Sequence, residues 1–260
     1  MHLGRILIFP IKSLDGLSLE QAVVTPGGIL QNDRVYAIFD RDGRVVNGKR
    51  TPRIHELRSA FDENIREVRL WPPGDSTPAQ FPLDNPAPLE QWLGDFFGFP
   101  VVLKYEPLKG FPDDREAFGP TIVSEASLLE IQSWFPELTL ASLRRRFRAN
   151  LELLATEPFG EDRLFGAPET LRPFQIGSVN CLGHNPCQRC VVPTRDPDSG
   201  RGVTEFQKKF MERRKATLPP WSDARRFNHF YRLTINTSIP PTEAGKVLRV
   251  NDAVLQQSPA

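Results

Sequence analysis

The chain has 260 residues, and its 33 basic and 32 acidic side chains leave a formal net charge of +1. This balance argues against an electrostatic nucleic-acid or membrane binder, so we expect neither nucleic acid nor membrane among its partners. The length allows one large domain or two small ones, with a core that needs no disulfide bonds.

Three cysteines occur without a signal-peptide pattern. The apolar run at residues 6–9 ends at Pro10 and is too short for a signal-peptide core or a membrane span. We therefore expect a cytoplasmic protein with reduced thiols. Proline is frequent, with 25 residues, and this favours a loop-rich, mostly β architecture over a helical bundle.

The first half of the chain predicts mainly strands. Residues 5–11 and 17–24 are strand candidates, and the Asp-Gly pair at 42–43 predicts a hairpin that joins 35–39 to 45–46. A second hairpin is expected over 57–71. Apolar side chains at helical spacing predict a helix over 88–97 that ends at Gly98. After a strand at 101–105, the loop at 107–120 separates a predicted domain 1–118 from a predicted domain 119–260.

The second half adds helices to further strands. Helices are expected over 124–135, where Ser124 or Ser127 is the N-cap, over 139–147 and over 203–215. Strands are expected at 121–123, 150–155, 171–176, 179–182, 230–235, 247–250 and 254–255. The predicted fold class is mainly β with some helix (α+β), built as two β-barrel-like units with helical decoration.

Residues 185–200, with the sequence NPCQRCVVPTRDPDSG, carry the most distinctive chemistry. Two residues separate Cys187 from Cys190, and arginines flank the second cysteine. A neighbouring arginine favours the thiolate, the form that attacks electrophiles and binds soft metals. A strand at 190–192 and a turn at 196–200 are expected to hold this thiol, so we expect Cys190 to lie close to the function.

The cysteine spacing leaves other possibilities open. The pair could be half of a zinc site, a dithiol redox pair or a lone functional cysteine, or both cysteines could be buried without a functional role. Only Cys181 and His184 could complete a zinc set, and ligands placed every three residues strain a tetrahedral site.

Several loops contain basic residues, each of which alone suggests a solvated surface charge. Gathered around one cleft they would suit a phosphate group. They are Lys12, Lys49, Arg50, Arg53, Arg144, Arg145, Arg146 and Arg148. The glycine-rich phosphate-loop motifs are absent from the sequence.

Seven stretches together resemble the MOSC family, named after the C-terminal domain of molybdenum-cofactor sulfurases. FPIKSLDG (9–16), the Asp-Arg pair and hairpin at 33–43, and TPRIHEL (51–57) resemble its N-terminal β-barrel module. SEASL (124–128), FRANLEL (147–153), PFGEDRLFG (158–166) and CQRCVVPTRDPDSG (187–200) resemble the MOSC domain. The last stretch is the most specific of the seven.

The resemblance implies a pterin-type molybdenum cofactor, molybdopterin, whose metal is held by Cys190. It also implies that Asp196 shapes the turn below the metal, which would make Cys190 and Asp196 the catalytic pair. Cofactor contacts map onto Lys12, Lys49 or Arg50, Ser124, Arg148, Asn150 and Thr194.

Three functions remain as hypotheses. The first is an oxidoreductase similar to the amidoxime-reducing proteins, which reduces small N-hydroxylated substrates and takes electrons from an external iron–sulfur protein or flavoprotein. The second is a sulfur carrier, in which Cys190 bears a persulfide supplied by a separate pyridoxal-phosphate-dependent cysteine desulfurase. The third is a zinc-stabilised binding module without enzymatic activity.

Overall fold

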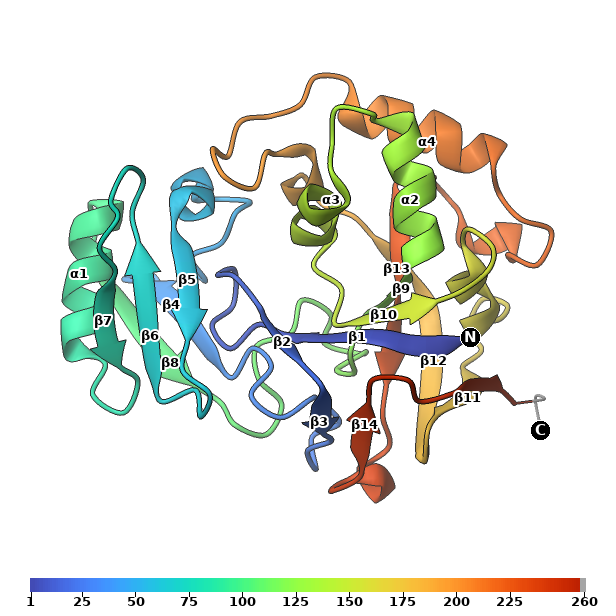
Figure 1. Ribbon diagram of the computed structural model, residues 1–260, viewed down its shortest axis with the longest axis horizontal. Helices are drawn as coiled ribbons and strands as arrows, with labels where there is room; N and C mark the ends of the chain where they lie inside the picture. The colour runs from blue at the N-terminus through green and yellow to red at the C-terminus, as the bar shows by residue number, and fades with distance from the viewer. Residues whose placement is uncertain (258–260) are drawn as a thin grey trace.

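The computed structural model describes residues 1–257, which form two units side by side (Figure 1). The N-terminal unit, on the left in Figure 1, contains two small antiparallel sheets beside helix α1 (Ala87–Phe97). One sheet pairs β4 (Tyr36–Asp40) with β8 (Val101–Tyr105). The other has the order β5 (Arg58–Phe61), β6 (Glu67–Trp71) and β7 (Ala79–Pro82).

The second unit is built on an eight-stranded sheet. In spatial order its strands are β15 (Val254–Gln256), β11 (Arg172–Ile176), β12 (Val179–Gln188), β13 (Arg232–Ser238), β9 (Ile122–Ser124), β10 (Leu151–Leu154), β1 (His2–Ile8) and β2 (Leu17–Leu19). The strands β3 (Gln21–Val23) and β14 (Val247–Arg249) form a separate pair. Three helices lie above the sheet in Figure 1: α2 (Glu125–Trp134), α3 (Leu140–Phe147) and α4 (Phe206–Ala216).

The beginning of the chain belongs physically to the second unit. Strand β1 pairs with β10, with Ile6 opposite Leu151, and its apolar side chains enter the same core as Ile122 and Ile235. The N-terminal unit has a core of its own around α1, β6 and β8. The chain therefore begins in the second unit, passes into the N-terminal unit and returns to the second.

The mainly-β fold with two units is confirmed, but the barrel expectation is not. The hydrogen-bonded order of the described strands ends at β15 on one side and β2 on the other. Within residues 1–257 no strand pair closes this order, although an isolated bridge joins His2 to Ala253 and the Val254 N–H donates to the Met1 carbonyl at 2.9 Å.

Local signals located the helix ends well. Gly98 ends α1 with a φ of 80°, which glycine adopts without a steric penalty. The Ser124 hydroxyl accepts a hydrogen bond from the Ser127 backbone N–H at 3.2 Å, so Ser124 is the N-cap of α2. Thr139 caps α3 in the same way, through the Ser142 N–H at 3.1 Å.

Two strand predictions need correction. Strand β12 continues to Gln188, six residues beyond the expected end at 182, because β13 pairs with it along this length. The strand expected at 190–192 is replaced by a 3₁₀ turn, Val192–Thr194. Pro193 sits inside that turn and has no N–H to give to a strand ladder. Strand β7 was not anticipated.

No helix within residues 1–257 combines the length and the apolar character that crossing a membrane requires. The cytoplasmic location stays a prediction.

A buried ion pair joins α4 to the loop after β10. The Arg214 guanidinium pairs with the Asp162 carboxylate, and their side chains are 1% and 4% exposed. Arg214 also lies over the Phe159 ring, 3.7 Å from its centroid, and the Ser222 hydroxyl donates to the same carboxylate. Removing one partner of such a pair leaves an uncompensated buried charge.

We predict that Arg214→Met lowers the free energy of unfolding by about 3–5 kcal/mol, because Asp162 stays buried without its cation. Lys208→Met is the matched control, since Lys208 lies on the same helix and its ion pair with Glu205 is exposed at both ends. It should change stability by less than about 0.5 kcal/mol. Urea unfolding monitored by circular dichroism measures both, and equal effects would contradict the prediction.

Candidate functional site

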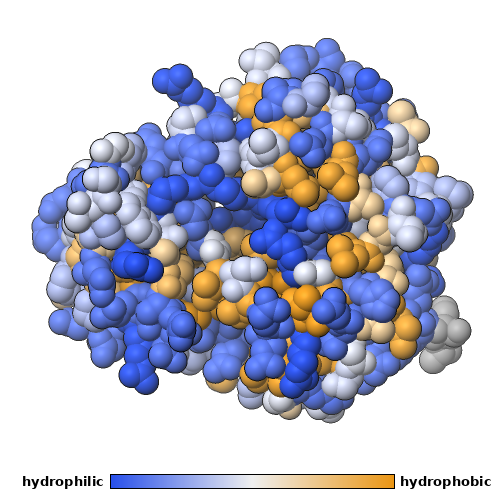
Figure 2. Space-filling view, in the orientation of Figure 1, coloured by the Kyte–Doolittle hydropathy of each residue, from blue (hydrophilic) through white to orange (hydrophobic). Residues whose placement is uncertain are grey.

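A cavity of about 680 Å³ lies between the two units and is lined by residues from both. The hollow near the centre of Figure 2 is rimmed largely by hydrophilic residues. Twelve lysine and arginine side chains line the cavity against five aspartate and glutamate side chains, an excess of seven positive charges. A protein of net charge +1 therefore concentrates positive charge at one place.

Two of the three cysteines line this cavity. Cys187 lies near the end of β12, and Cys190 follows two residues after the strand ends. The strand end is fixed because the Arg189 N–H donates to the Tyr231 carbonyl at 3.0 Å and its guanidinium donates to the Phe147 carbonyl at 2.8 Å. Cys187 and Cys190 are half-buried, so both thiols are open to a molecule in the cavity.

Cys181 is different. It points into the core of the second unit with 2% exposure, and burial, with a smaller effect of Glu243, raises the pKa of its thiol to about 12. Cys187 lies six residues further along the same strand, which in a regular strand would place it on the same face, but the pairing of β12 with β13 shifts register between Gly183 and Asn185, and Cys187 lines the cavity.

Arginines from both units hold the segment that follows Cys190. Arg146 on α3 donates to the Pro193 carbonyl at 3.0 Å, and Arg145 donates to the Pro197 carbonyl at 2.9 Å. Arg58, from the N-terminal unit, donates to the same Pro197 carbonyl at 3.0 Å. Arg195 reaches back and donates to the Gly48 carbonyl. The cysteine segment is thus bonded to both walls of the cavity.

Asp196 organises the turn at 196–200 from within. Its carboxylate accepts hydrogen bonds from the Ser199 N–H and hydroxyl, both at 2.9 Å. Burial opposes ionisation, but these hydrogen bonds outweigh it and lower the pKa of Asp196. Asp196 does not line the cavity, so its placement suits turn formation behind Cys190.

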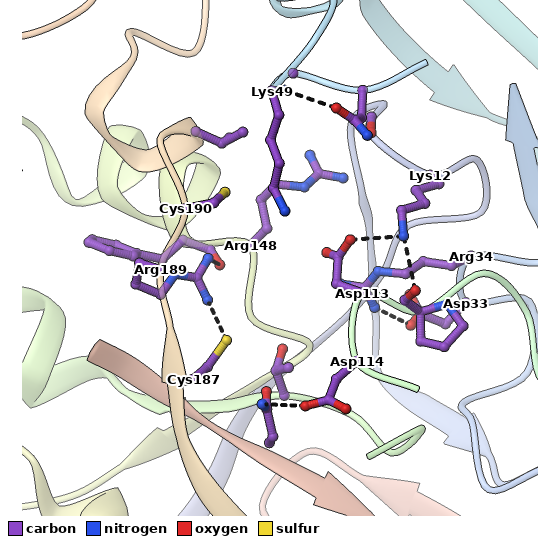
Figure 3. A pocket seen from close by; sticks show the side chains of 18 of the residues that line it. Lys12, Asp33, Arg34, Lys49, Asp113, Asp114, Arg148, Cys187, Arg189 and Cys190 are labelled. Atoms are coloured by element: carbon purple, nitrogen blue, oxygen red, sulfur yellow. Dashed lines mark hydrogen bonds and ion pairs between the residues drawn. The ribbon is translucent and has the colours of Figure 1, made fainter. Parts of the chain in front are cut away.

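Basic residues from distant parts of the chain lie opposite Cys190 and form what we call the basic wall: Lys12, Arg34, Lys49 and Arg148 (Figure 3). Arg148 ends α3 in a left-handed conformation, with φ 52°, and donates to the Leu14 carbonyl at 2.6 Å. Its guanidinium lies over the Phe9 ring at 4.1 Å. Burial and the nearby Arg34 charge lower the pKa of Arg148 to about 10, so it stays charged at neutral pH.

Arg34 is a cavity residue that the sequence reasoning did not single out as a site residue. It also lies over Phe9, at 5.1 Å, and donates to the Asn150 side-chain oxygen at 3.0 Å. The Asp-Arg pair at 33–34 was noticed only as a motif. Its neighbour Asp33 accepts a hydrogen bond from the Phe9 N–H at 2.8 Å and so ties this loop to the end of β1.

His55 was also missed. It lines the cavity, and its imidazole packs against Gly48, where an added Cβ would lie 2.4 Å from Nε2. Burial and the positive charges of Arg195 and Arg148 lower the pKa of His55, so it is neutral at pH 7. Nothing in the sequence pattern distinguished it from a surface histidine.

The structure brings together four of the predicted site residues, namely Lys12, Lys49, Arg148 and Cys190. The others do not line the cavity. Arg50 is exposed, and the Thr194 hydroxyl donates to the Val191 carbonyl. The Asn150 side-chain oxygen accepts a hydrogen bond from Arg34. Ser124 is fully buried and donates to the Glu161 carboxylate at 2.6 Å. The family resemblance left Lys49 and Arg50 as alternatives for one basic contact, and Lys49 is the one that lines the cavity.

The four candidate zinc ligands do not converge. Cys181 and Cys187 stand six residues apart on one extended strand, roughly 20 Å at about 3.3 Å per residue. Within residues 1–257, no group of three or more His, Cys, Asp or Glu side chains lies close enough to hold a metal ion.

Comparison with known proteins gives two family matches. The MOSC N-terminal beta barrel domain matches residues 1–93, and the MOSC domain matches residues 117–254. The human mitochondrial amidoxime-reducing component 1 is 22% identical over 235 residues, which cover 76% of this chain and 67% of that protein. The rat mitochondrial amidoxime reducing component 2 is 24% identical over the same shares. A rice molybdenum cofactor sulfurase is 22% identical over 77% of this chain, but the match spans only 29% of the rice protein.

The three thiols should differ sharply in reactivity. At pH 8.5, iodoacetamide should alkylate Cys187 and Cys190 in the folded protein and leave Cys181 unmodified, because a thiol with a pKa of about 12 is protonated and this one is also buried. Peptide mass spectrometry measures the modification, and alkylation in urea, where all three should react, is the control. Modification of Cys181 in the folded protein would contradict the assignment.

Proposed function

Since the chain belongs to the MOSC family, we propose that it binds a pterin-type molybdenum cofactor and works as an oxidoreductase on small N-hydroxylated molecules. Cys190 is the proposed protein ligand to the metal. The observation that carries the proposal is the convergence of this thiol with Lys12, Lys49 and Arg148 on one cavity, although the four residues are spread from position 12 to position 190.

The residues of the cavity fit such a cofactor chemically. A molybdenum ion already bound by dithiolene sulfurs is a soft centre, and a cysteine thiolate is a soft ligand. The phosphate group needs ammonium or guanidinium donors, and the basic wall provides them. A cavity of about 680 Å³ lies within the usual range for small-molecule and cofactor sites.

Each part of the chain has a separate task in this proposal. Lys12, Lys49 and Arg148 hold the phosphate and the pterin, and Cys190 holds the metal. The arginines that donate hydrogen bonds to residues 193–197 fix the backbone next to Cys190 and so restrict the position of its thiol. When bound, the cofactor supplies the metal-centred redox chemistry. The electrons would come from an external iron–sulfur protein or flavoprotein.

A sulfur carrier is the second candidate. One observation favours it: Cys187 lines the same cavity as Cys190, and its sulfur accepts a contact from the Arg189 guanidinium at 3.5 Å. In that function Cys190 would bear a persulfide received from a separate cysteine desulfurase. No feature of the described residues favours the zinc-stabilised module.

We predict that Cys190→Ser folds normally, with an unfolding free energy within about 1 kcal/mol of the wild type, because the side-chain volume hardly changes. It should keep the pterin and the molybdenum that the dithiolene sulfurs hold, but lose turnover of a small N-hydroxylated substrate, since a hydroxyl is a hard and mostly protonated ligand that does not replace the thiolate. Elemental analysis gives the metal content, and fluorescence after oxidative release gives the pterin content.

Cys187→Ser is the matched control for this variant and should keep metal, pterin and turnover. Full turnover by Cys190→Ser would overturn the proposed ligand. A sulfur carrier would instead show one added sulfur atom in the intact mass after treatment with a cysteine desulfurase and cysteine. That gain should disappear in Cys190→Ser.

Adjacent lysine and arginine residues give a second test. Lys49→Met should weaken pterin retention by roughly tenfold, because a charged contact to phosphate is worth about 1.5 kcal/mol. Arg50→Met removes the same charge one residue later, from a side chain that does not line the cavity, and should change retention less than about twofold. Pterin-to-protein ratios after dialysis measure both. Equal losses would mean that the effect is general electrostatics and not a contact in the cavity.

A further inference from the structure

Lys12 has every hydrogen-bond donor of its ammonium group already in use. Its Nζ donates to the Phe111 carbonyl at 2.8 Å and to the Pro112 carbonyl at 3.0 Å, and it pairs with the Asp113 carboxylate at 2.8 Å. A lysine ammonium has three N–H donors. A phosphate group can therefore reach Lys12 only if one of these three acceptors leaves.

All three acceptors belong to one segment, residues 106–120, which we call the strap. It joins β8 to β9 without forming a helix or strand of its own. One end is bonded to the N-terminal unit through the Glu106 N–H and the Val35 carbonyl, at 2.8 Å, and the other to β13 of the second unit through the Gly119 N–H and the Thr237 carbonyl, at 2.8 Å. Its middle is held where the Phe111 N–H donates to the Arg34 carbonyl at 2.8 Å and the Asn236 amide donates to Asp114 at 3.1 Å. Between these points the strap runs along the cavity.

Asp113 is the one charged acceptor of the three. Figure 3 shows its carboxylate directed into the pocket beside Lys12 and facing Arg148. Desolvation by the surrounding protein opposes ionisation of Asp113, but the charges of Lys12 and Arg34 outweigh it and lower the pKa of this carboxyl to about 2. The carboxylate is thus ionised at neutral pH. Its side chain is 76% exposed whereas that of Lys12 is 12% exposed, so the acid can swing away and the lysine cannot.

We propose that Asp113 is a built-in competitor for the anion that Lys12 binds, and that the strap releases this carboxylate when a phosphate group enters. The inference rests on the proposed function, because it takes Lys12 as part of a phosphate site. Of the three acceptors, the carboxylate is the one that an incoming anion repels, whereas the two carbonyls are neutral.

The exchange also sets a preference among ligands. Replacing a carboxylate by another single negative charge gains no charge interaction with Lys12, Arg34 and Lys49. Replacing it by a phosphate monoester, which carries nearly two charges, does gain one. Asp113 therefore favours dianionic phosphate groups and disfavours chloride and small carboxylic acids. A ligand with a single negative charge does not displace the Asp113 carboxylate from Lys12, so the site discriminates against it.

The test uses the full chain, purified without cofactor, with inorganic phosphate at pH 8 as the probe. Calorimetry measures phosphate affinity. Trypsin cleavage after Arg115, an exposed residue of the strap, measures strap release and is followed by mass spectrometry. In the wild type, phosphate should accelerate this cleavage, and sodium chloride at equal ionic strength should not.

Asp113→Asn should bind phosphate roughly fivefold more tightly, the effect of removing a competing ion pair worth about 1 kcal/mol. Its strap should be cleaved faster before phosphate is added. Glu116→Gln removes an equal charge from the same strap without touching Lys12, and both quantities should stay within about twofold of the wild type. Asp113→Ala gives a second variant if Asp113→Asn does not fold.

Suppose that Lys12→Met abolishes phosphate binding but both Asp113 variants bind phosphate as the wild type does, or more weakly. The competitor role of Asp113 would then be overturned, and the phosphate site would remain. An equal gain from Glu116→Gln would overturn that role too, because the effect would then be general charge. If phosphate binding by the wild type does not depend on Lys12, then Lys12 is not part of a phosphate site, and the proposed function of the basic wall fails as well.

Discussion

Guanidinium groups bonded to backbone carbonyls hold the cysteine segment between the two units, and the candidate site depends on them. The Pro193 and Pro197 carbonyls accept from Arg146, Arg145 and Arg58, while Arg195 donates to the Gly48 carbonyl across the cavity. A proline-containing segment has fewer backbone donors of its own. Side chains from both units therefore replace a strand ladder, and the position of Cys190 is set by both walls at once.

This bonding has an electrostatic consequence. The carbonyl partners do not cancel the arginine charges, whereas Asp198, which pairs with Arg145 and Arg58, and Asp196, which pairs with Arg146, cancel part of them. The side chains that line the cavity still carry an excess of seven positive charges. Because the whole chain carries only +1, the remaining residues carry a net charge of −6, from 21 basic and 27 acidic side chains. A low-dielectric cleft lined by one sign of charge concentrates ions of the opposite sign. The overall charge balance argued against polyanion binding, and its uneven distribution favours one small anionic ligand.

The local parts of the structure were predictable from sequence, and the long-range parts were not. Gly98, Ser124 and Thr139 marked helix ends because capping involves neighbours within four residues. The length of β12 depends on pairing with β13, some fifty residues away, which no local pattern encodes. Motif resemblance indicated Lys12, Lys49, Arg148 and Cys190 one by one, but only the fold brings them to one cavity. It also indicated Ser124, whose hydroxyl is used by Glu161 inside the core. The Lys12–Asp113 pair spans 101 positions and gave no signal.

The central claim is that one cavity holds a molybdenum cofactor through Cys190 and the basic wall. Its most direct test is elemental analysis of the wild-type protein after expression in a molybdate-supplemented host, with molybdenum, zinc and phosphorus measured per chain. We expect close to one molybdenum per chain, phosphorus that accompanies it, and no stoichiometric zinc. Stoichiometric zinc, or folded protein with neither molybdenum nor phosphorus, would contradict it.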